Sequence, residues 1–413
     1  MVKVKVTILA SEWGSSKGGL STLNRELAIQ LAKCPEVEIT FYLPKCSQED
    51  KEEAHQHNVK IVEAKPRPGF EHLTWLCFAP KDLQIDIIVG HGVKLGKQAQ
   101  IIKEQKDCKW VQVVHTDPEE LGMFKSYSNP IQRGEEKHKT EVELCEMADF
   151  VVGVGSKLSE AFRSYLCGCP KHDDVFHFTP GIFEEFADVK HSVPSIGRQL
   201  IVLLFGRGDK EDFELKGFDI AGKAVAALQD TRLMFVGAPD GEHQEIAKRF
   251  TECGVPANRL RVRGFVQDRE SLKRLFQEVS LLVMPSRSEG FGLTGLEALS
   301  AGLPVLVSGN SGFGEALCSL PFGSLFVITS DDPADWTSAI EKICAKDWNC
   351  RLEEAESLRH SYDRKYNWRV QIEVLINKMI SWVHGMGFSL SLSLSLFFMI
   401  QTKGNLSSNI IKN

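Results

Sequence analysis

The sequence predicts an α/β protein made of two doubly wound parallel-sheet domains that face each other across a cleft. Short runs rich in valine, isoleucine and phenylalanine alternate with helical patterns in two successive series, which is typical of parallel sheets. The length of 413 residues exceeds what one hydrophobic core normally supports, so two domains of about 200 residues each are expected. Ligands of such sheets bind beyond the carboxyl ends of the strands, where two facing domains would share one cleft.

The first series is expected to form the N-terminal domain, residues 1–184. Its runs share a β-branched and aromatic composition and are 4–9, 37–43, 59–62, 85–89, 110–114 and 150–154. A polar stretch with Pro194 and Gly197 but no periodicity follows. Residues 185–199 are therefore interpreted as a linker.

The second series is expected to form the C-terminal domain, residues 200–365. Its runs are 201–205, 233–236, 260–266, 281–284, 305–307 and 325–328. An amphipathic pattern then predicts a C-terminal helix over residues 366–385, followed by a low-complexity Ser-Leu tail over residues 386–413. The apolar run of this tail is short and serine-rich, whereas a membrane span needs about 20 mostly apolar residues. A frayed end is favoured over an anchor, and membrane association has no support.

Composition excludes some classes of function. Charged residues make up 25% of the chain, hydrophobic residues 43%, and the net charge is −6, which does not indicate a nucleic-acid partner. The eleven cysteines are scattered and odd in number, so they are interpreted as reduced. Cys167 and Cys169 are the only close pair, which is weak support for a metal site. The amino terminus alternates polar and apolar residues and lacks the apolar core of a signal peptide, so a cytoplasmic location is expected.

The segment from Ser286 to Ser308 carries the strongest functional signal. A strand-like run precedes it, and three glycines in six residues lead into a helical pattern. The unpaired N–H groups and the dipole at such a helix start favour a phosphate. Glu289 and Glu297 flank the turn eight residues apart, and because carboxylates repel phosphate they are expected to accept hydrogen bonds from hydroxyl groups. Hydroxyl groups on either side of a diphosphate describe a nucleotide sugar.

Weaker patterns lie at the ends of two strands of the first domain. Gly18 and Gly19 would let the backbone approach a bulky ligand, but they form neither a dinucleotide fingerprint nor a P-loop, and a structural turn explains them about as well. His115 follows the run 110–114 and either donates to a sugar hydroxyl or is an ordinary strand-end histidine. His91 and His138 are interpreted as surface or packing residues.

The second domain offers two further candidates. Arg207 follows the run 201–205, and Lys216 opens the next helix, so together they could clamp a diphosphate, although solvated surface charges are the alternative. Arg263 and Phe265 flank a glycine whose backbone could read a base edge. An aromatic residue in a strand is also often simply part of the core.

Taken together, these residues resemble the retaining glycosyltransferases of family 4, in the GT-B group that includes sucrose synthases and mannosyltransferases acting on inositol lipids. The resemblance covers residues 3–380 and depends most on the E-x7-E segment with its Gly-Phe-Gly core and the later Gly-Leu-Pro-Val. It implies a GT-B fold of two Rossmann-like domains. It also implies a hexosyltransferase of class EC 2.4 that uses a UDP- or GDP-linked sugar and an acceptor.

The resemblance assigns roles to the matching residues. Arg207 and Lys216 would bind the donor diphosphate, Glu297 the ribose hydroxyls, and Glu289 the hydroxyls of the transferred sugar. The other residues implied to contact the donor are Gly18, Gly19, Arg263, Phe265, Gly290, Phe291, Gly292, Leu293 and Thr294.

The resemblance also implies how the reaction proceeds. His115 would lie beside the reacting sugar on the acceptor side, and no side chain would act as a covalent nucleophile, so the paired carboxylates of glycosidases are the wrong template. Catalysis would stabilise the departing diphosphate and align the two substrates. Arginine and lysine would take the place of a metal ion, so neither a metal nor another cofactor is expected.

Two other functions are compatible with the same fold. One is a catalytically silent sensor or scaffold that binds a nucleotide sugar. The other is a pyridoxal-phosphate sugar phosphorylase, which is disfavoured because no lysine follows the segment between Glu289 and Glu297 in a suggestive context. The sugar, the base, the acceptor and the oligomeric state are not predicted by the sequence.

Overall fold

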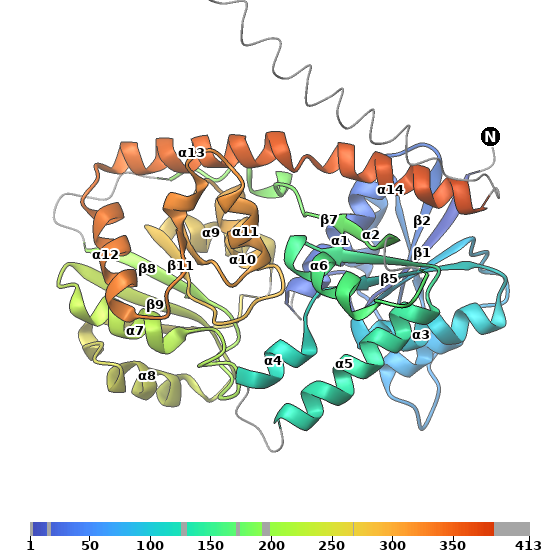
Figure 1. The fold of residues 1–413 in the computed structure, drawn as a ribbon, viewed down its shortest axis with the longest axis horizontal. Helices are drawn as coiled ribbons and strands as arrows, with labels where there is room; N and C mark the ends of the chain where they lie inside the picture. Colours follow the sequence, from blue (N-terminus) through green and yellow to red (C-terminus); the bar gives the residue numbers. More distant parts are fainter. Residues whose placement is uncertain are drawn as a thin grey trace, which may run out of the picture.

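The structure, a computed structural model, describes residues 3–14, 18–124, 130–170, 174–191, 199–266 and 268–383. The predicted fold class is confirmed. Each half of the molecule contains one parallel sheet with helices on its faces (Figure 1). The predicted tail, residues 386–413, lies outside the described residues, as do residues 192–198 of the predicted linker.

The N-terminal sheet has seven strands in the order β3-β2-β1-β4-β5-β6-β7. The strands are β1 (Val4–Leu9), β2 (Val37–Leu43), β3 (Val59–Glu63), β4 (Ile87–His91), β5 (Lys109–Val114), β6 (Phe150–Val154) and β7 (Phe176–Phe178). The short strand β7 has no counterpart among the predicted runs. Every residue of β4 and β6 is buried, as expected for a parallel sheet covered on both faces.

Helices connect these strands and cover the sheet. They are α1 (Gly19–Ala32), α2 (Gln48–Gln56), η1 (His72–Cys77), α3 (Gly92–Gln105), α4 (Pro118–Phe124), α5 (Pro130–Met147), α6 (Ser156–Tyr165) and η3 (Glu184–Phe186). The helix η3 lies in the connection that leads into the second domain.

The C-terminal sheet has six strands in the order β10-β9-β8-β11-β12-β13. They are β8 (Leu200–Phe205), β9 (Thr231–Ala238), β10 (Leu260–Gly264), β11 (Leu281–Met284), β12 (Val305–Ser308) and β13 (Val327–Ile328). Two strands are shorter than the sequence predicts. β10 ends at Gly264, where the pairing register with β9 shifts. The run 325–328 begins in a 3₁₀ turn, so only its last two residues pair with β12.

The helices of the second domain complete the α/β alternation. They are α7 (Phe218–Ala227), α8 (His243–Glu252), η4 (Ala257–Arg259), α9 (Arg269–Glu278), α10 (Leu293–Ser300), α11 (Gly312–Cys318), η5 (Gly323–Phe326), α12 (Pro333–Cys344), α13 (Trp348–Lys365) and α14 (Trp368–Val383). Aspartate or serine side chains cap the N-termini of α9, α11, α12 and α13, which stabilises these helix starts.

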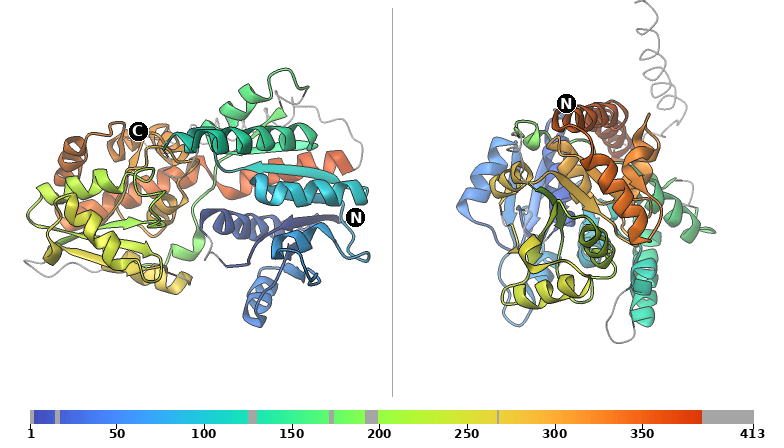
Figure 2. Two further views of the ribbon diagram at one scale, coloured as in Figure 1. Left: turned by 90° about the horizontal axis from the view of Figure 1, so that it is seen from below. Right: turned by 90° about the vertical axis from the view of Figure 1, so that its left-hand side faces the viewer.

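The last two helices cross the molecule. α13 packs against α10 in the second domain, whereas α14 packs against α1 in the first, and together they run along one edge of both halves (Figures 1 and 2). The helical path breaks after Tyr366, the C-cap of α13. The helix predicted over residues 366–385 thus corresponds to α14, which begins at Trp368 and packs on the first domain.

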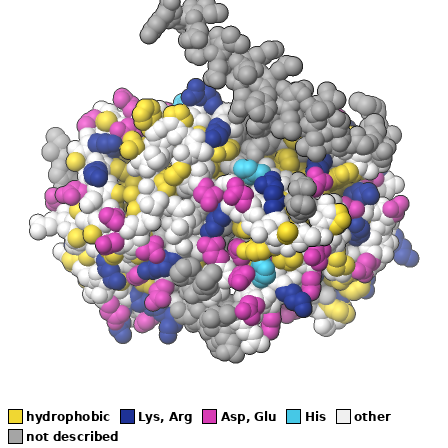
Figure 3. All heavy atoms as spheres, in the orientation of Figure 1, with side chains coloured by type: hydrophobic (Ala, Val, Ile, Leu, Met, Phe, Trp, Pro, Cys, Tyr) yellow, Lys and Arg dark blue, Asp and Glu magenta, His cyan; other side chains and the backbone are white. Residues whose placement is uncertain are grey.

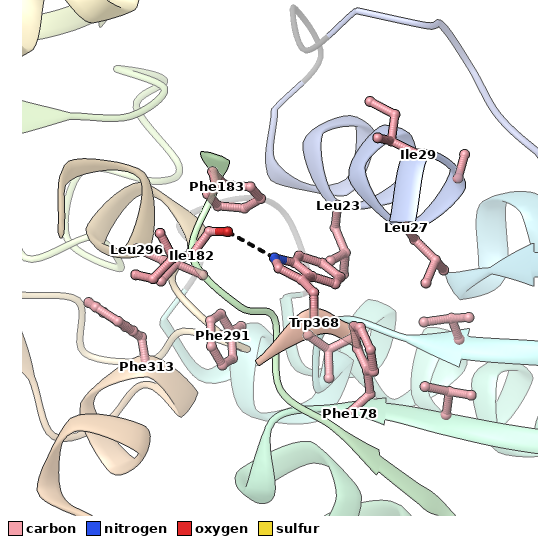
Figure 4. Packing of buried hydrophobic residues seen from close by; sticks show 14 of the residues in the cluster. Leu23, Leu27, Ile29, Phe178, Ile182, Phe183, Phe291, Leu296, Phe313 and Trp368 are labelled. Atoms are coloured by element: carbon pink, nitrogen blue, oxygen red, sulfur yellow. Dashed lines mark hydrogen bonds between the residues drawn. The ribbon is translucent and has the colours of Figure 1, made fainter. Parts of the chain in front are cut away.

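Apolar packing joins the two domains at this crossing. Trp368 is 4% exposed, and its Nε1–H donates to the carbonyl oxygen of Ile182 at 3.0 Å. Figure 4 shows its indole among Phe178 and Phe183, with Phe291 of the second domain nearby. One buried hydrophobic cluster thus contains residues of both domains, so the two domains pack directly against each other.

Candidate active site

Four helices around the domain boundary start without a side-chain cap. Each begins after a glycine with positive φ: Gly18 before α1, Gly155 before α6, Gly217 before α7 and Gly292 before α10. Serine, threonine, aspartate and asparagine are the usual residues at this position, because their side chains accept from first-turn N–H groups. Glycine leaves these donors to other partners, and an anion is a suitable one.

The turn before α10 lies against the first domain. A Cβ atom added to Gly290 would lie 2.0 Å from the carbonyl oxygen of His115, so only glycine allows this approach. The next residue, Phe291, contacts Gly155, since a Cβ atom added to Gly155 would lie 2.9 Å from the ring of Phe291. The tip of the turn therefore meets the carboxyl ends of β5 and β6.

The backbone of this turn is also fixed from within its own domain. Gly290 and Phe291 accept hydrogen bonds through their carbonyl oxygens from the N–H groups of Gly312 (3.1 Å) and Phe313 (2.6 Å). At Gly292, φ is +100°, a backbone conformation that favours glycine. The entry to α10 is thus held by hydrogen bonds from the start of α11.

The structure brings two predicted site residues into direct contact. The ammonium group of Lys216 forms an ion pair and hydrogen bond with Oε2 of Glu289. Ser286 lies on the same oxygen, with its hydroxyl at 3.5 Å. Both members of the pair keep some exposure, 27% for the lysine side chain and 20% for that of the glutamate. A cation and a hydrogen-bond acceptor therefore stand side by side at the edge of the turn.

The glycines of the first domain approach α10 from the opposite side. A Cβ atom added to Gly19 would lie 3.2 Å from Leu293 Cδ1, and Gly18 is exposed just before it. Leu293 and Thr294 form the start of α10 and are partly exposed. The two uncapped helix starts of α1 and α10 thus face a common region.

Glu297 lies deeper than the sequence suggests. It is 5% exposed, and Arg269 donates to its Oε1 from Nη1 at 2.8 Å. Thr22 of α1 also bonds to this carboxylate, and Glu185 of η3 lies 3.4 Å from Arg269. Burial raises the pKa of Glu297, and the neighbouring guanidinium opposes that rise. No pattern in the sequence indicates the part of Arg269, because its two carboxylate partners come from η3 and α10, far from each other along the chain.

Within the described ranges, three other predicted residues form no hydrogen bond or ion pair with Lys216, Glu289 or Glu297. They are Arg207, Arg263 and Phe265. Arg207 is exposed between Gly206 and Gly208, at the carboxyl end of β8. Arg263 forms an ion pair with Glu278 of α9 at 2.6 Å. Phe265 is 43% exposed, so it is not part of the core, and base contact remains the expectation for it. Figure 3 shows that positive and negative side chains are interspersed over the face of Figure 1.

His115 has a neighbour that the sequence does not reveal. Nδ1 of His91 lies 2.7 Å from Nε2 of His115, and the rings stack with centroids 5.0 Å apart. His91 is fully buried whereas His115 keeps partial exposure. Burial lowers the pKa of His115 to about 4 and that of His91 well below its usual value. Both rings are therefore neutral at pH 7. His91 is buried, as expected for a packing residue, but it also makes a specific polar contact with His115.

Behind this pair lies a buried carboxyl group. Glu141 of α5 is 3% exposed, accepts from Gln112 Nε2 at 3.1 Å and also accepts from the N–H of Val93. Burial raises its pKa to about 7. Gln112 donates in addition to the carbonyl oxygen of Gly92 at 3.0 Å. These bonds hold the turn that carries His91.

The raised pKa of Glu141 predicts a pH dependence of stability. Because the pKa is higher in the folded state than in the unfolded chain, its stabilising effect is complete below pH 4.5 and is lost as the pH rises through 7. The free energy of unfolding of the wild type, minus that of Glu141→Gln, should fall by about 3 kcal/mol between pH 4.5 and pH 8. Urea denaturation at a series of pH values measures it, and parallel profiles for the two proteins would contradict it.

Neither a metal centre nor a membrane span emerges from the described part of the chain. Within those residues no group of three or more histidine, cysteine, aspartate or glutamate side chains is placed to hold a metal ion. Among the same residues, no helix has the length and apolar character needed to cross a bilayer.

The chain matches one family model over most of its length. The model described as "Family 4 Glycosyltransferase in conflict systems" matches residues 7–375. Among curated proteins, a D-inositol 3-phosphate glycosyltransferase of Corynebacterium urealyticum is 24% identical over 314 residues, which cover 71% of this chain and 71% of that protein.

Solved structures show the same fold. Sucrose-phosphate synthase from Thermosynechococcus elongatus superposes with a TM-score of 0.71 at 19% identity, covering 93% of this chain and 100% of that one. HepE of Anabaena in complex with UDP-glucose superposes with a TM-score of 0.67 at 18% identity, covering 91% and 99% of the two chains. Both likenesses concern the arrangement of the two domains, the GT-B fold.

Proposed function

This chain belongs to the family 4 glycosyltransferases of conflict systems, and from that membership we propose that it moves a hexosyl group from a nucleoside-diphosphate sugar to an acceptor hydroxyl with retention of configuration. The observation that carries the proposal is the contact of Lys216 with Glu289 beside a turn whose Gly290 meets the backbone of His115. A cation, a hydrogen-bond acceptor and the backbone of the first domain thus lie close together, which supports binding of a donor sugar at this turn.

The donor would lie along the turn before α10. Its diphosphate would face Arg207, Lys216 and the first-turn N–H groups of Leu293 and Thr294, which combine full charges with the helix dipole. Glu289 would accept from hydroxyls of the transferred sugar while its other side is held by Lys216. As the sugar leaves, negative charge grows on the diphosphate, and preorganised donors stabilise that charge without reorganising.

His115 would act as a neutral group. Because burial lowers its pKa to about 4, it is not an imidazolium at pH 7 and supplies no full positive charge. A neutral imidazole offers one N–H donor and one acceptor nitrogen. It would therefore orient a hydroxyl of the sugar or of the acceptor by hydrogen bonding, and the close approach of Gly290 supports such a position.

Glu297 would hold the ribose. A carboxylate has two oxygens and about four lone-pair sites, so it can accept from Arg269 and still accept from ribose hydroxyls. Glu297 lies on α10 and bonds to Thr22 of α1. Binding of the nucleotide would therefore be linked to the contact between the two domains. Arg263, which is partly exposed, and Phe265, which is exposed just beyond the end of β10, are proposed to border the base.

A nucleotide-release assay tests the proposed function. The protein is incubated with UDP- and GDP-sugars in turn, including UDP-glucose, the sugar nucleotide bound in the HepE complex. The first acceptor tested is D-inositol 3-phosphate, the compound in the name of the Corynebacterium urealyticum relative. Release of UDP or GDP with product formation is expected. Thermal stabilisation by a nucleotide sugar without release would favour the silent binder. If the protein showed neither release nor stabilisation, the proposed donor site would be wrong.

Glu297→Gln is expected to weaken donor binding. The amide keeps one oxygen for Arg269 but loses the charge-assisted bonds to ribose, each worth about 1.5–3 kcal/mol. The KM for the nucleotide sugar should rise at least about tenfold, with a smaller change in kcat. Steady-state kinetics at varied donor concentration measure it. Glu341→Gln, on the exposed side of α12, is the control, and an equal KM in all three proteins would remove Glu297 from the ribose site.

Removal of divalent metal ions is expected to leave turnover unchanged. The proposed diphosphate site already supplies two cations, Arg207 and Lys216, in the place where other transferases use a metal ion. Nucleotide release should therefore be the same, within about twofold, before and after treatment with EDTA. Loss of activity on chelation, restored by Mg²⁺ or Mn²⁺, would show that these two side chains are insufficient.

A further inference from the structure

The contact between His91 and His115 restricts where each ring carries its proton. Neutral imidazole has one N–H group and one acceptor nitrogen. Nδ1 of His91 and Nε2 of His115 are 2.7 Å apart, so one of them donates and the other accepts. Only two arrangements satisfy this condition, and they give His115 opposite tautomers.

The surroundings of His91 distinguish the two arrangements. Its Nε2 atom is buried and has no hydrogen-bond partner among the described residues. If Nδ1 of His91 accepted, this Nε2 would carry a buried N–H group without a partner. Orphaned N–H donors are rarer in proteins than under-satisfied acceptors, so the arrangement with the proton on Nδ1 of His91 is favoured. His115 then accepts at Nε2 and carries its own proton on Nδ1.

The position of His91 is firmly held. It ends β4 and precedes α3, and its neighbour in the adjacent strand is Val113. Gln112 donates to the carbonyl oxygen of Gly92 at 3.0 Å and to Glu141 at 3.1 Å. The buried polar groups behind the turn thus fix the ring that faces His115. An apolar side chain would fill the same volume without burying an unpaired nitrogen, which costs free energy.

We propose that His91 is a positioning residue that donates from Nδ1 to Nε2 of His115 and so presents Nδ1–H of His115 to a hydroxyl of the sugar or the acceptor. His91 has no exposed surface, so it acts only through His115. The proposal rests on the proposed function for its catalytic consequence, whereas the pairing itself is a property of the free protein.

Two substitutions of His91 separate hydrogen bonding from packing. Asparagine places an amide near the position of Nδ1 and can still donate, whereas leucine fills space without a donor. In the nucleotide-release assay, His91→Leu should lower kcat at least about tenfold, with the KM for the nucleotide sugar within about twofold, because most of the proposed donor contacts lie in the other domain. His91→Asn should recover most of kcat. His360→Leu, on the exposed side of α13, is the control.

A second measurement does not depend on activity. In the wild-type protein labelled with ¹⁵N-histidine, NMR should show a protonated Nδ1 and an unprotonated Nε2 for His115, assigned by the signal lost in His115→Ala. The reverse pattern would overturn the proposal, as would equal kcat values for His91→Leu and the wild type. If the wild type releases no nucleotide from any sugar, the proposed function fails, but the NMR pattern still decides the pairing.

Discussion

Replacing Arg207 by alanine is expected to lower kcat by about a hundredfold to a thousandfold, the range measured when one preorganised donor to a developing negative charge is removed. The guanidinium is exposed at the carboxyl end of β8 and makes no ion pair with the described residues. It is therefore free to form a bidentate contact with a departing diphosphate. Steady-state nucleotide release at saturating donor measures the change.

The control for this prediction is an arginine of similar exposure outside the cleft. Arg364 lies on the exposed side of α13, so Arg364→Ala should retain wild-type kcat. Arg207→Lys should recover only part of the loss, since an ammonium group offers charge without the planar fork. A kcat for Arg207→Ala within about threefold of the wild type would show that the diphosphate is held by other groups.

Replacing Trp368 by alanine is expected to lower the free energy of unfolding by about 3–5 kcal/mol. The indole is 4% exposed, packs against Phe178 and Phe183, and donates to the carbonyl oxygen of Ile182. Its removal leaves a cavity at the point where the two domains meet and a buried carbonyl without its donor. Urea denaturation followed by circular dichroism measures the loss.

Trp368→Phe separates the two contributions. It keeps an aromatic ring in the cluster but loses the N–H group, so it should cost about 1–3 kcal/mol, the penalty for an unsatisfied buried acceptor. Because the site lies across the same boundary, both variants should also be less active when assayed near their unfolding midpoints. Stability of Trp368→Ala within about 1 kcal/mol of the wild type would mean that this packing does not hold the domains together.

The fold was predictable because its signals are local. Strand-like runs and helical patterns alternate along the chain, and the runs at 4–9, 37–43, 150–154 and 281–284 coincide with β1, β2, β6 and β11. Short elements were not predictable in the same way. β7 has three residues and β13 two, so their formation depends on pairing with a neighbouring strand rather than on composition.

The candidate site also has one part that the sequence reveals and one part that only the fold reveals. The turn around Gly290 and Gly292 is visible in the sequence, because only glycine fits where the backbone approaches a neighbour. The contact between His91 and His115, and the ion pair between Arg269 and Glu297, join residues 24 and 28 positions apart. Such contacts depend on which strand ends and helix starts become neighbours after folding, and neither residue type nor spacing reveals them.

The two connections between the domains touch each other. The hydroxyl of Tyr362 donates to the carbonyl oxygen of Pro180 at 2.8 Å, and a Cβ atom on Gly181 would lie 2.6 Å from the carbonyl oxygen of Tyr366. Because the two connections meet at one place, any movement of one domain relative to the other is expected to be a rotation about this point. A rotation about this point would part Gly290 from His115, so under the proposed function the site would be complete only while the two domains are in contact.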